Sequence, residues 1–104
     1  KISYKLGKFS ESVDSYQCAI KIKPNFTKAY NNLGLVYKDL GKFTESINSY
    51  QEAIKINPEY AEAHNNLGVT FKELGELDKS INSYQNAIKI NPNYAEAYNN
   101  IGNA

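Results

Sequence analysis

The sequence predicts an all-α protein, an α-solenoid built from antiparallel pairs of helices. Three observations lead to this prediction: phrases of sequence return every 34 residues, apolar residues recur three or four positions apart, and glycine and proline stand at regular intervals. A spacing of three or four places side chains on one face of a helix. A repeat that holds two such helices cannot cover its own apolar face, so neighbouring repeats must stack.

The 34-residue period is carried by two phrases. The first, AYNNLG with small variations, starts at Ala29, Ala63 and Ala97. The second, SINSYQ or SVDSYQ, starts at Ser12, Ser46 and Ser80. The register never shifts, and it divides the chain into one domain with a partial repeat, two complete repeats and a second partial repeat, at 1–26, 27–60, 61–94 and 95–104.

The first helix of a repeat is clearest in residues 27–40. Its apolar stripe, spaced three or four residues apart, consists of Tyr30, Leu33, Tyr37 and Leu40. A glycine follows directly, as is usual just beyond a helix C-terminus. We therefore expect a first helix to end before each of Gly7, Gly41 and Gly75.

The second helix of a repeat begins a few residues later. A side-chain oxygen suited to capping the first free amides is supplied by Ser10, Thr44 and Asp78. In the copy that follows Thr44, the buried face is expected to contain Ile47, Tyr50, Ala53 and Ile54. A proline pushes the preceding residue out of the helical region, so this helix ends near Pro58, and its copies end near Pro24 and Pro92. Gly34 and Gly68 are small enough to let the two helices of a pair approach closely.

These residues together resemble the tetratricopeptide-repeat (TPR) family over the whole chain. The resemblance rests on the 34-residue helix–turn–helix unit with its Leu33-Gly34 pair, the glycine between the helices, Ala53 in the second helix and the closing Pro58. It implies a right-handed superhelix whose first helices line a concave face, and a function in protein–protein recognition. Two positions depart from the family pattern. His64 stands in place of a large aromatic residue, and serines replace a frequent alanine at Ser12, Ser46 and Ser80.

Composition excludes several classes of function. The net charge is +1 and the isoelectric point about 8.0, so nothing attracts the chain to nucleic acid or to a membrane surface. No apolar run approaches the length of a transmembrane helix. Cys18 is the only cysteine, which excludes an intramolecular disulfide and fits the reducing cytoplasm.

Residues suited to catalysis are scarce. His64 and Cys18 together make at most two ligands, whereas zinc sites use three or four. His64 lies on the apolar stripe of its helix, where we expect a packed core residue, and Cys18 is expected to face outward. No phosphate-binding loop, nucleophile elbow or metalloprotease motif occurs. We therefore expect no enzyme activity, no cofactor and no metal.

The partner expected from the family resemblance is a protein or peptide, bound on the concave face. In each first helix, the residues that point away from the apolar stripe are the candidates for contacting it. They are Asn31, Asn32, Leu35, Lys38 and Asp39 in the first complete repeat, Asn65, Asn66, Val69, Lys72 and Glu73 in the second, and Asn99 and Asn100 in the last partial repeat.

The asparagines in this set suit peptide binding, because an amide offers both a donor and an acceptor to a peptide backbone. Three of them, Asn32, Asn66 and Asn100, are similar to the asparagine ladder in the repeat region of O-linked N-acetylglucosamine transferases. The alternative is that these asparagines form a hydrated surface without a ligand. Leu35 and Val69 would add an apolar patch between them.

Chaperone-adaptor members of the family hold a C-terminal carboxylate with lysines and arginines. Here Asn31, Asn65 and Asn99 occupy a position where such a lysine would stand, and Asp39 and Glu73 add negative charge. This argues against a carboxylate clamp.

Two further interpretations remain open. The chain is expected to be a piece of a longer protein, and its first and last partial repeats complement each other, so it would stack head to tail as an open, heterologous assembly. It would otherwise serve as a spacer or as the accessory array of a glycosyltransferase.

Overall fold

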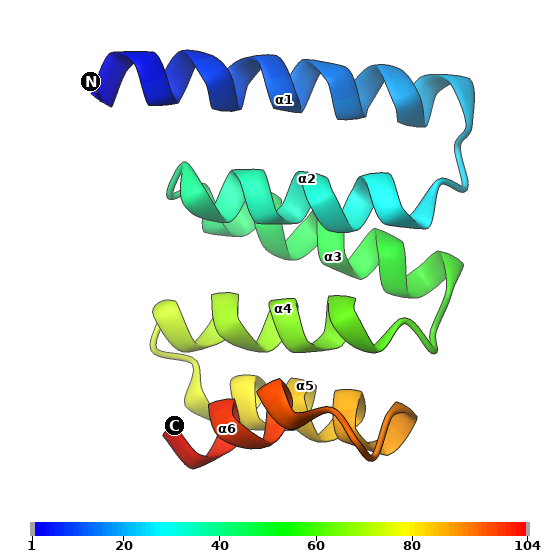
Figure 1. The fold of residues 1–104 in the computed structure, drawn as a ribbon, viewed down its shortest axis with the longest axis vertical. Helices are drawn as coiled ribbons and strands as arrows, with labels where there is room; N and C mark the ends of the chain where they lie inside the picture. Colours follow the sequence, from blue (N-terminus) through cyan, green and yellow to red (C-terminus); the bar gives the residue numbers. More distant parts are fainter. Residues whose placement is uncertain (1, 104) are drawn as a thin grey trace.

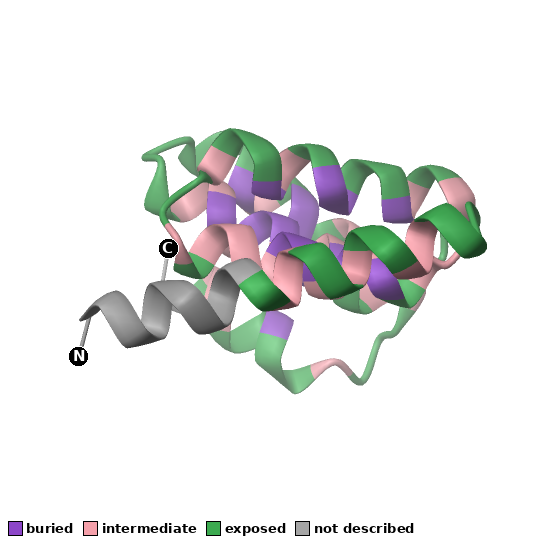
Figure 2. Ribbon diagram, turned by 90° about the horizontal axis from the view of Figure 1, so that it is seen from above, coloured by how far each residue is buried: buried purple, intermediate pink, exposed green. Residues whose placement is uncertain are grey.

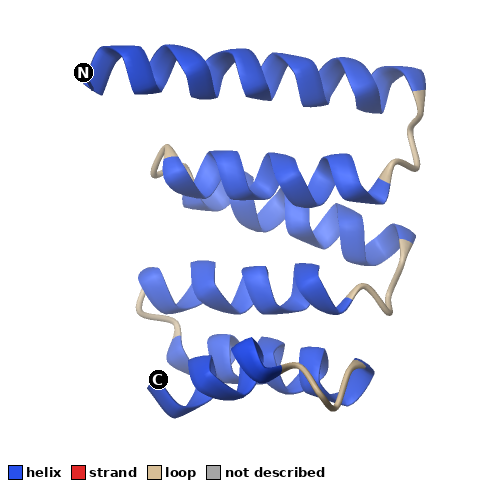
Figure 3. Cartoon of the chain, viewed as in Figure 1, coloured by secondary structure: helices blue, strands red, loops and turns tan. Residues whose placement is uncertain are grey.

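The computed structural model describes the backbone of residues 2–103 and the side chains of residues 11–102. Over the described residues the chain forms helices joined by short loops, without strands (Figure 3). The helices are α1 (Ile2–Ile22), α2 (Thr27–Asp39), α3 (Phe43–Ile56), α4 (Ala61–Glu73), α5 (Leu77–Ile90) and α6 (Ala95–Asn103). The all-α solenoid that the sequence predicts is confirmed.

The helices stack in chain order, with α1 at one edge and α6 at the other (Figure 1). α2 pairs with α3, and α4 pairs with α5, each as an antiparallel hairpin. α2 also contacts α4, and α4 contacts α6, so these three helices form one layer with α3 and α5 behind it (Figure 1). Each helix touches only near neighbours in the sequence, as expected for a solenoid.

Glycine ends the first helix of each hairpin, as the sequence predicts. Gly41 and Gly75 have φ of 79° and 81°, in the left-handed region that favours glycine. Beyond α2, the Gly41 amide donates to the Lys38 carbonyl (2.9 Å) and the Lys42 amide donates to the Tyr37 carbonyl (2.8 Å). This pair of bonds is a Schellman motif, which satisfies the carbonyls left free at the helix end. The same two bonds recur beyond α4.

Proline ends the second helix of each hairpin, again as predicted. Asn57 and Asn91 follow α3 and α5, and both are extended because each precedes a proline.

Two predictions about helix boundaries are wrong. α1 runs without a break through Gly7 and Ser10, where a turn was expected. A glycine inside a helix costs only about 0.5–1 kcal/mol relative to alanine, so Gly7 by itself does not end the helix. Thr44 and Asp78 do not cap α3 and α5, because these helices begin one residue earlier and both caps, Lys42 and Glu76, lack a side-chain hydrogen bond.

The core is made of smaller residues than the apolar stripes suggest. Figure 2 shows the buried segments where the helices face one another. Tyr50, Ala53 and Leu33 are buried as expected, but Tyr30, Tyr37, Leu40, Ile47 and Ile54 are only partly buried. Buried residues that lie outside the predicted stripes include Ala29, Ala63, Ser46, Ser49 and Thr70. Small side chains at these positions allow the helices of a hairpin to pack closely around one tyrosine.

That tyrosine packs against a glycine of the partner helix. A Cβ atom on Gly34 would lie 2.5 Å from Cε1 of Tyr50, and one on Gly68 would lie 2.6 Å from Cε1 of Tyr84. Both tyrosine rings are fully buried. The same glycines accept a hydrogen bond across the hairpin, since Ser46 Oγ donates to the Gly34 carbonyl (2.8 Å) and Ser80 Oγ donates to the Gly68 carbonyl (2.7 Å). The serines that replace the family's frequent alanine therefore hold the two helices together.

The hydroxyl of Tyr50 is buried and makes no hydrogen bond within the described part of the chain. The hydroxyls of Ser46 and Thr70 lie near enough to lower the pKa of Tyr50, but neither is in hydrogen-bonding geometry with it. Desolvation is the larger effect, and it raises the pKa of Tyr50 well above its ordinary value.

Substitution of Gly68 by alanine tests the close packing of the hairpin. We expect the free energy of unfolding to fall by about 1–3 kcal/mol, because the new methyl group overlaps the Tyr84 ring. Gly102→Ala is the matched control, since a Cβ there meets no atom within 4 Å. Urea titrations followed by circular dichroism compare the two variants. Equal stability of both would show that the helices separate freely at this contact.

Substitution of Tyr50 by phenylalanine tests the buried hydroxyl. The pKa of Tyr50 in the folded state lies above the unfolded value of about 10. The stability that the neutral Tyr50 side chain contributes is therefore fully present below pH 10, and it is lost as the pH rises further. The decline reaches at most about 1.4 kcal/mol per pH unit for one tyrosine. We expect Tyr50→Phe to be at least as stable as the parent at pH 7 and more stable above pH 10. Tyr98→Phe, at an exposed site, serves as control in melts from pH 8 to 12.

Candidate functional site

The candidate binding surface is the side of the layer formed by α2, α4 and α6, here called the A-helix face. The structure places the sequence-predicted residues in three groups. Asn31 and Asn65 are buried. Partly buried residues are Asn32, Asn66, Asn100, Leu35, Val69, Lys38 and Lys72. Exposed residues are Asp39, Glu73 and Asn99.

The prediction that Asn31 and Asn65 are open to a ligand is wrong. Their exposed fractions are 1% and 0%, because α2 packs on α4 and α4 packs on α6 at these positions. An amide at such a site must find a hydrogen-bond partner within the protein.

The partner is an asparagine of the next helix in the layer. Asn66 Nδ2 donates to Asn31 Oδ1 (3.1 Å), and Asn100 Nδ2 donates to Asn65 Oδ1 (3.0 Å). Asn65 Nδ2 in turn donates to Glu96 Oε1 (3.3 Å). Each of the two asparagine–asparagine links spans 35 residues, one repeat plus one position, so α2 is tied to α4, and α4 to α6, by an amide pair.

These links fix how the partly buried asparagines face solvent. Because one N–H of Asn66 is directed to Asn31, the rotation of its amide group is set. The second N–H and the Oδ1 of Asn66 make no hydrogen bond to another described residue. Asn100 is held in the same way by Asn65. Asn32, at the start of the row, has no side-chain hydrogen bond within the described residues.

The charges on the A-helix face are mixed. Lys38 Nζ lies 4.0 Å from Glu73 Oε1, which links α2 to α4 at the edge of the face. Asp39, Glu62 and Glu96 are exposed. Lys28 is the exposed lysine on this side of α2. The face therefore lacks the concentration of positive charge that would hold an acidic ligand.

Tyr60 and Tyr94 border the buried asparagines, and sequence analysis did not identify them as part of the site. Burial raises the pKa of Tyr60, and the nearby Glu62 carboxylate, to which Tyr60 Oη donates (3.3 Å), raises it further. Burial also raises the pKa of Tyr94, with a smaller effect from Glu96. The side chain of Asn31 lowers the pKa of Tyr60, and that of Asn65 lowers the pKa of Tyr94, but neither effect outweighs burial. Both tyrosines stay neutral at physiological pH and can donate a hydrogen bond.

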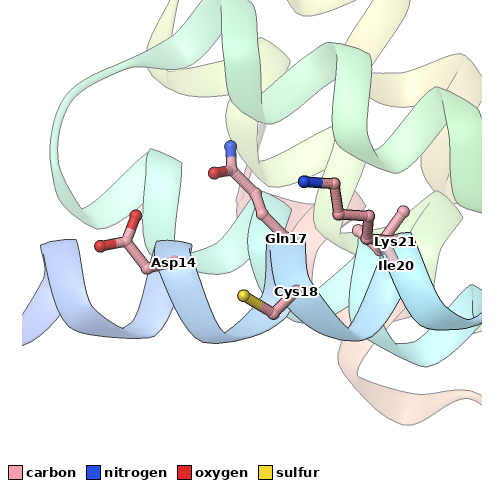
Figure 4. A pocket seen from close by; sticks show the side chains of 5 residues that line it. All are labelled: Asp14, Gln17, Cys18, Ile20 and Lys21. Atoms are coloured by element: carbon pink, nitrogen blue, oxygen red, sulfur yellow. The ribbon is translucent and has the colours of Figure 1, made fainter.

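His64 and Cys18 do not form a site together. His64 is partly buried rather than packed in the core, and its Nε2 donates to the Pro58 carbonyl (3.1 Å). It borders a groove of about 380 Å³ between α3, α4 and α5. Cys18 is exposed, as predicted, and borders a hollow whose lining side chains all come from α1 (Figure 4). A hollow along one helix has no second wall from which to hold a ligand.

Among the described residues, no three His, Cys, Asp or Glu side chains come together as a metal ion would require. None of the described helices is both long and apolar enough to cross a membrane.

Comparison with known proteins gives a family match and a structural match. The family model described as TPR repeat matches residues 1–41, 34–75 and 70–104. A solved structure of the first TPR of Spaghetti (RPAP3), bound to the HSP90 peptide SRMEEVD, superposes with a TM-score of 0.88 at 25% sequence identity. The match covers 96% of this chain and 79% of that one. No curated protein matches this sequence. The similarity of Asn32, Asn66 and Asn100 to the ladder of the transferases stays a prediction.

Substitution of Asn65 by alanine tests the amide links. Removing a buried amide leaves Asn100 without its acceptor and Glu96 without its donor, so we expect the free energy of unfolding to fall by about 1–3 kcal/mol. The exposed Asn48 on α3 provides the control, and Asn48→Ala should change stability by less than about 0.5 kcal/mol. If urea unfolds both variants at the same concentration, the links do not stabilise the layer.

Proposed function

The chain belongs to the TPR family, and we propose that it binds an extended peptide segment of a partner protein on the A-helix face. The observation that carries this proposal is the row of amides from Asn32 through Asn66 to Asn100, two of which are held in a fixed orientation by an asparagine of the preceding helix in the layer. A peptide backbone offers alternating donors and acceptors, and an asparagine amide can pair with both.

Fixed orientation reduces the entropy that binding must overcome. A free asparagine side chain samples several rotamers, and restricting it costs binding energy. Asn66 and Asn100 are already restricted in the unbound protein, because each donates one N–H to a buried acceptor. Their remaining donor and acceptor are available to a ligand at no further rotational cost.

The structural neighbour supports the class of ligand, since that TPR domain is bound to a peptide. The charges of this chain argue for a different peptide composition. On its A-helix face, four carboxylates stand against three lysines, Lys28, Lys38 and Lys72. The carboxylates are those of Asp39, Glu62, Glu73 and Glu96, and the last of these already accepts a hydrogen bond from Asn65. Asn31 and Asn65 are buried and cannot reach a terminal carboxylate. We therefore propose a neutral or basic segment, recognised mainly through its backbone.

The affinity from the amides alone is small. Each hydrogen bond contributes about 0.5–1.5 kcal/mol, so three of them give on the order of 2–4 kcal/mol, which corresponds to millimolar affinity at best. Leu35 and Val69 are partly exposed and lie in the same two helices as Asn32 and Asn66, and apolar contact with them would add to the binding energy.

A peptide-array screen followed by fluorescence anisotropy tests this function. The parent chain should bind a set of extended neutral or basic peptides and should bind SRMEEVD more weakly. Asn32→Ala should weaken binding of the best array peptide by about 2- to 12-fold, because its amide makes no other hydrogen bond that the fold would lose. Combining it with Asn66→Ala, Leu35→Ser and Val69→Ser should abolish detectable binding.

Asn48→Ala is the control again, since Asn48 lies on α3, outside the A-helix face. Circular dichroism establishes that each variant folds. Binding that is unchanged in the fourfold variant, or lost equally in Asn48→Ala, would place the peptide elsewhere. Tighter binding of SRMEEVD than of neutral peptides would reject backbone-directed recognition.

A further inference from the structure

A groove of about 380 Å³ lies between α3, α4 and α5, and it shares no residue with the A-helix face. α3 and α5 both pack on α4, and all three helices contribute side chains to its lining. The apolar part of the lining comes from Ile54, Leu67 and Phe71. Leu67 is buried, whereas Ile54 and Phe71 are only partly buried, so the groove offers apolar surface that the fold does not cover completely.

Two positions in this groove carry smaller side chains than their counterparts one repeat earlier. His64 stands where the preceding repeat has Tyr30, and an imidazole is smaller than a phenol. The Nε2 of His64 donates to the Pro58 carbonyl (3.1 Å), which directs the ring toward the loop between α3 and α4. Phe71 stands where the preceding repeat has Tyr37, and it lacks the hydroxyl. This repeat therefore leaves more room at the groove than the preceding one.

The groove keeps the partner of the missing hydroxyl. In the preceding repeat, Gln17 Nε2 donates to Tyr37 Oη (3.2 Å). Gln51 is the counterpart of Gln17 and lines the groove, but Phe71 offers it no hydroxyl. Gln51 makes no side-chain hydrogen bond to another described residue. The groove thus presents an amide at the place where the same chain binds a tyrosine hydroxyl one repeat earlier.

α5 adds two further amides to the lining. Asn82 and Asn86 lie about one turn apart on α5, and both border the groove. Neither makes a side-chain hydrogen bond to another described residue. An amide offers both donors and an acceptor, so polar groups from α3 and α5 accompany the apolar lining. A ligand that matches this groove has an apolar body and a polar end.

We propose that this groove binds a tyrosine side chain of a partner protein. The ring packs on the apolar lining beside Phe71, and the hydroxyl accepts a hydrogen bond from Gln51. This arrangement repeats the one that Gln17 and Tyr37 form within the chain. The volume of about 380 Å³ lies near the lower end of the roughly 300–1,000 Å³ of small-ligand sites, so it suits one side chain and not a whole helix. The site is independent of the peptide site proposed on the A-helix face.

Charge favours acidic residues next to that tyrosine. Lys79 lines the groove at the position that Glu45 has in the preceding repeat. Asn86 likewise replaces Glu52, so an ammonium and an amide stand in place of two carboxylates. Lys79 Nζ lies 3.2 Å from Glu76 Oε2, but both side chains are exposed and such a pair is weak, so Lys79 is available to a ligand carboxylate. The partner segment is therefore acidic, unlike the neutral or basic peptide proposed for the A-helix face.

NMR titration of the ¹⁵N-labelled chain with the peptide N-acetyl-Glu-Tyr-Glu-amide tests the proposal. The side-chain NH₂ signals of Gln51, Asn82 and Asn86 should shift together. The dissociation constant should be on the order of 1 mM, because one aromatic side chain and one or two hydrogen bonds supply the binding energy. Phenylalanine in place of the tyrosine of the peptide should weaken binding about 2- to 12-fold. Lysine in place of both glutamates should also weaken it.

Variants of the chain locate the contact. His64→Tyr combined with Phe71→Tyr introduces the residues of the preceding repeat, fills the groove and should weaken binding of the tyrosine peptide about tenfold or more. Gln51→Ala should weaken the tyrosine peptide about 2- to 12-fold and leave the phenylalanine peptide unchanged. Gln85→Ala is the matched control, since Gln85 has the same position one repeat later and does not line the groove. Circular dichroism establishes that each variant folds.

Several outcomes would overturn the proposal. One is the absence of shifts at the three amides up to about 10 mM peptide. Others are equal binding of the tyrosine and phenylalanine peptides, tighter binding of the lysine peptide, or unchanged binding by the variant with the filled groove. The fourfold variant of the A-helix face should bind the tyrosine peptide like the parent, and loss of binding there would assign the peptide to that face instead.

Discussion

The close contact between a glycine of one helix and a tyrosine of the next organises this molecule. Gly34 against Tyr50, and Gly68 against Tyr84, leave no room even for a methyl group. This distance brings Ser46 and Ser80 within hydrogen-bonding reach of the glycine carbonyls. Because the tyrosine occupies most of the space between the helices, most of the remaining core positions are filled by alanine, serine and threonine, and Leu33 and Leu67 are the large aliphatic residues buried among the described residues. The hairpin is thus a rigid unit, and the solenoid is a stack of such units.

The stacking of hairpins determines the chemistry of the A-helix face. Packing of α2 on α4 and of α4 on α6 buries Asn31 and Asn65, which then require partners. Asn66 donates to Asn31, and Asn100 donates to Asn65. Each bond also orients the part of the donating amide that faces solvent. One interaction therefore stabilises the layer and also prepares a row of hydrogen-bonding groups for a ligand. The proposed binding function depends on these hydrogen bonds, because they both stabilise the layer and orient the amides that would contact a peptide.

The sequence by itself determined the repeat length, the helical hairpins and the residues that end them. Gly41, Gly75 and the prolines act through local backbone conformation, which depends on residue type and not on distant contacts. The break expected at Gly7 does not occur, because a glycine by itself costs a helix interior only about 0.5–1 kcal/mol. Sequence placed the asparagines on the correct helices but not at the correct depth. Only the tertiary structure decided that Asn31 is fully buried and Asn32 only partly, because neighbouring positions on a helix differ in direction by about 100° and their burial depends on where the next helix packs.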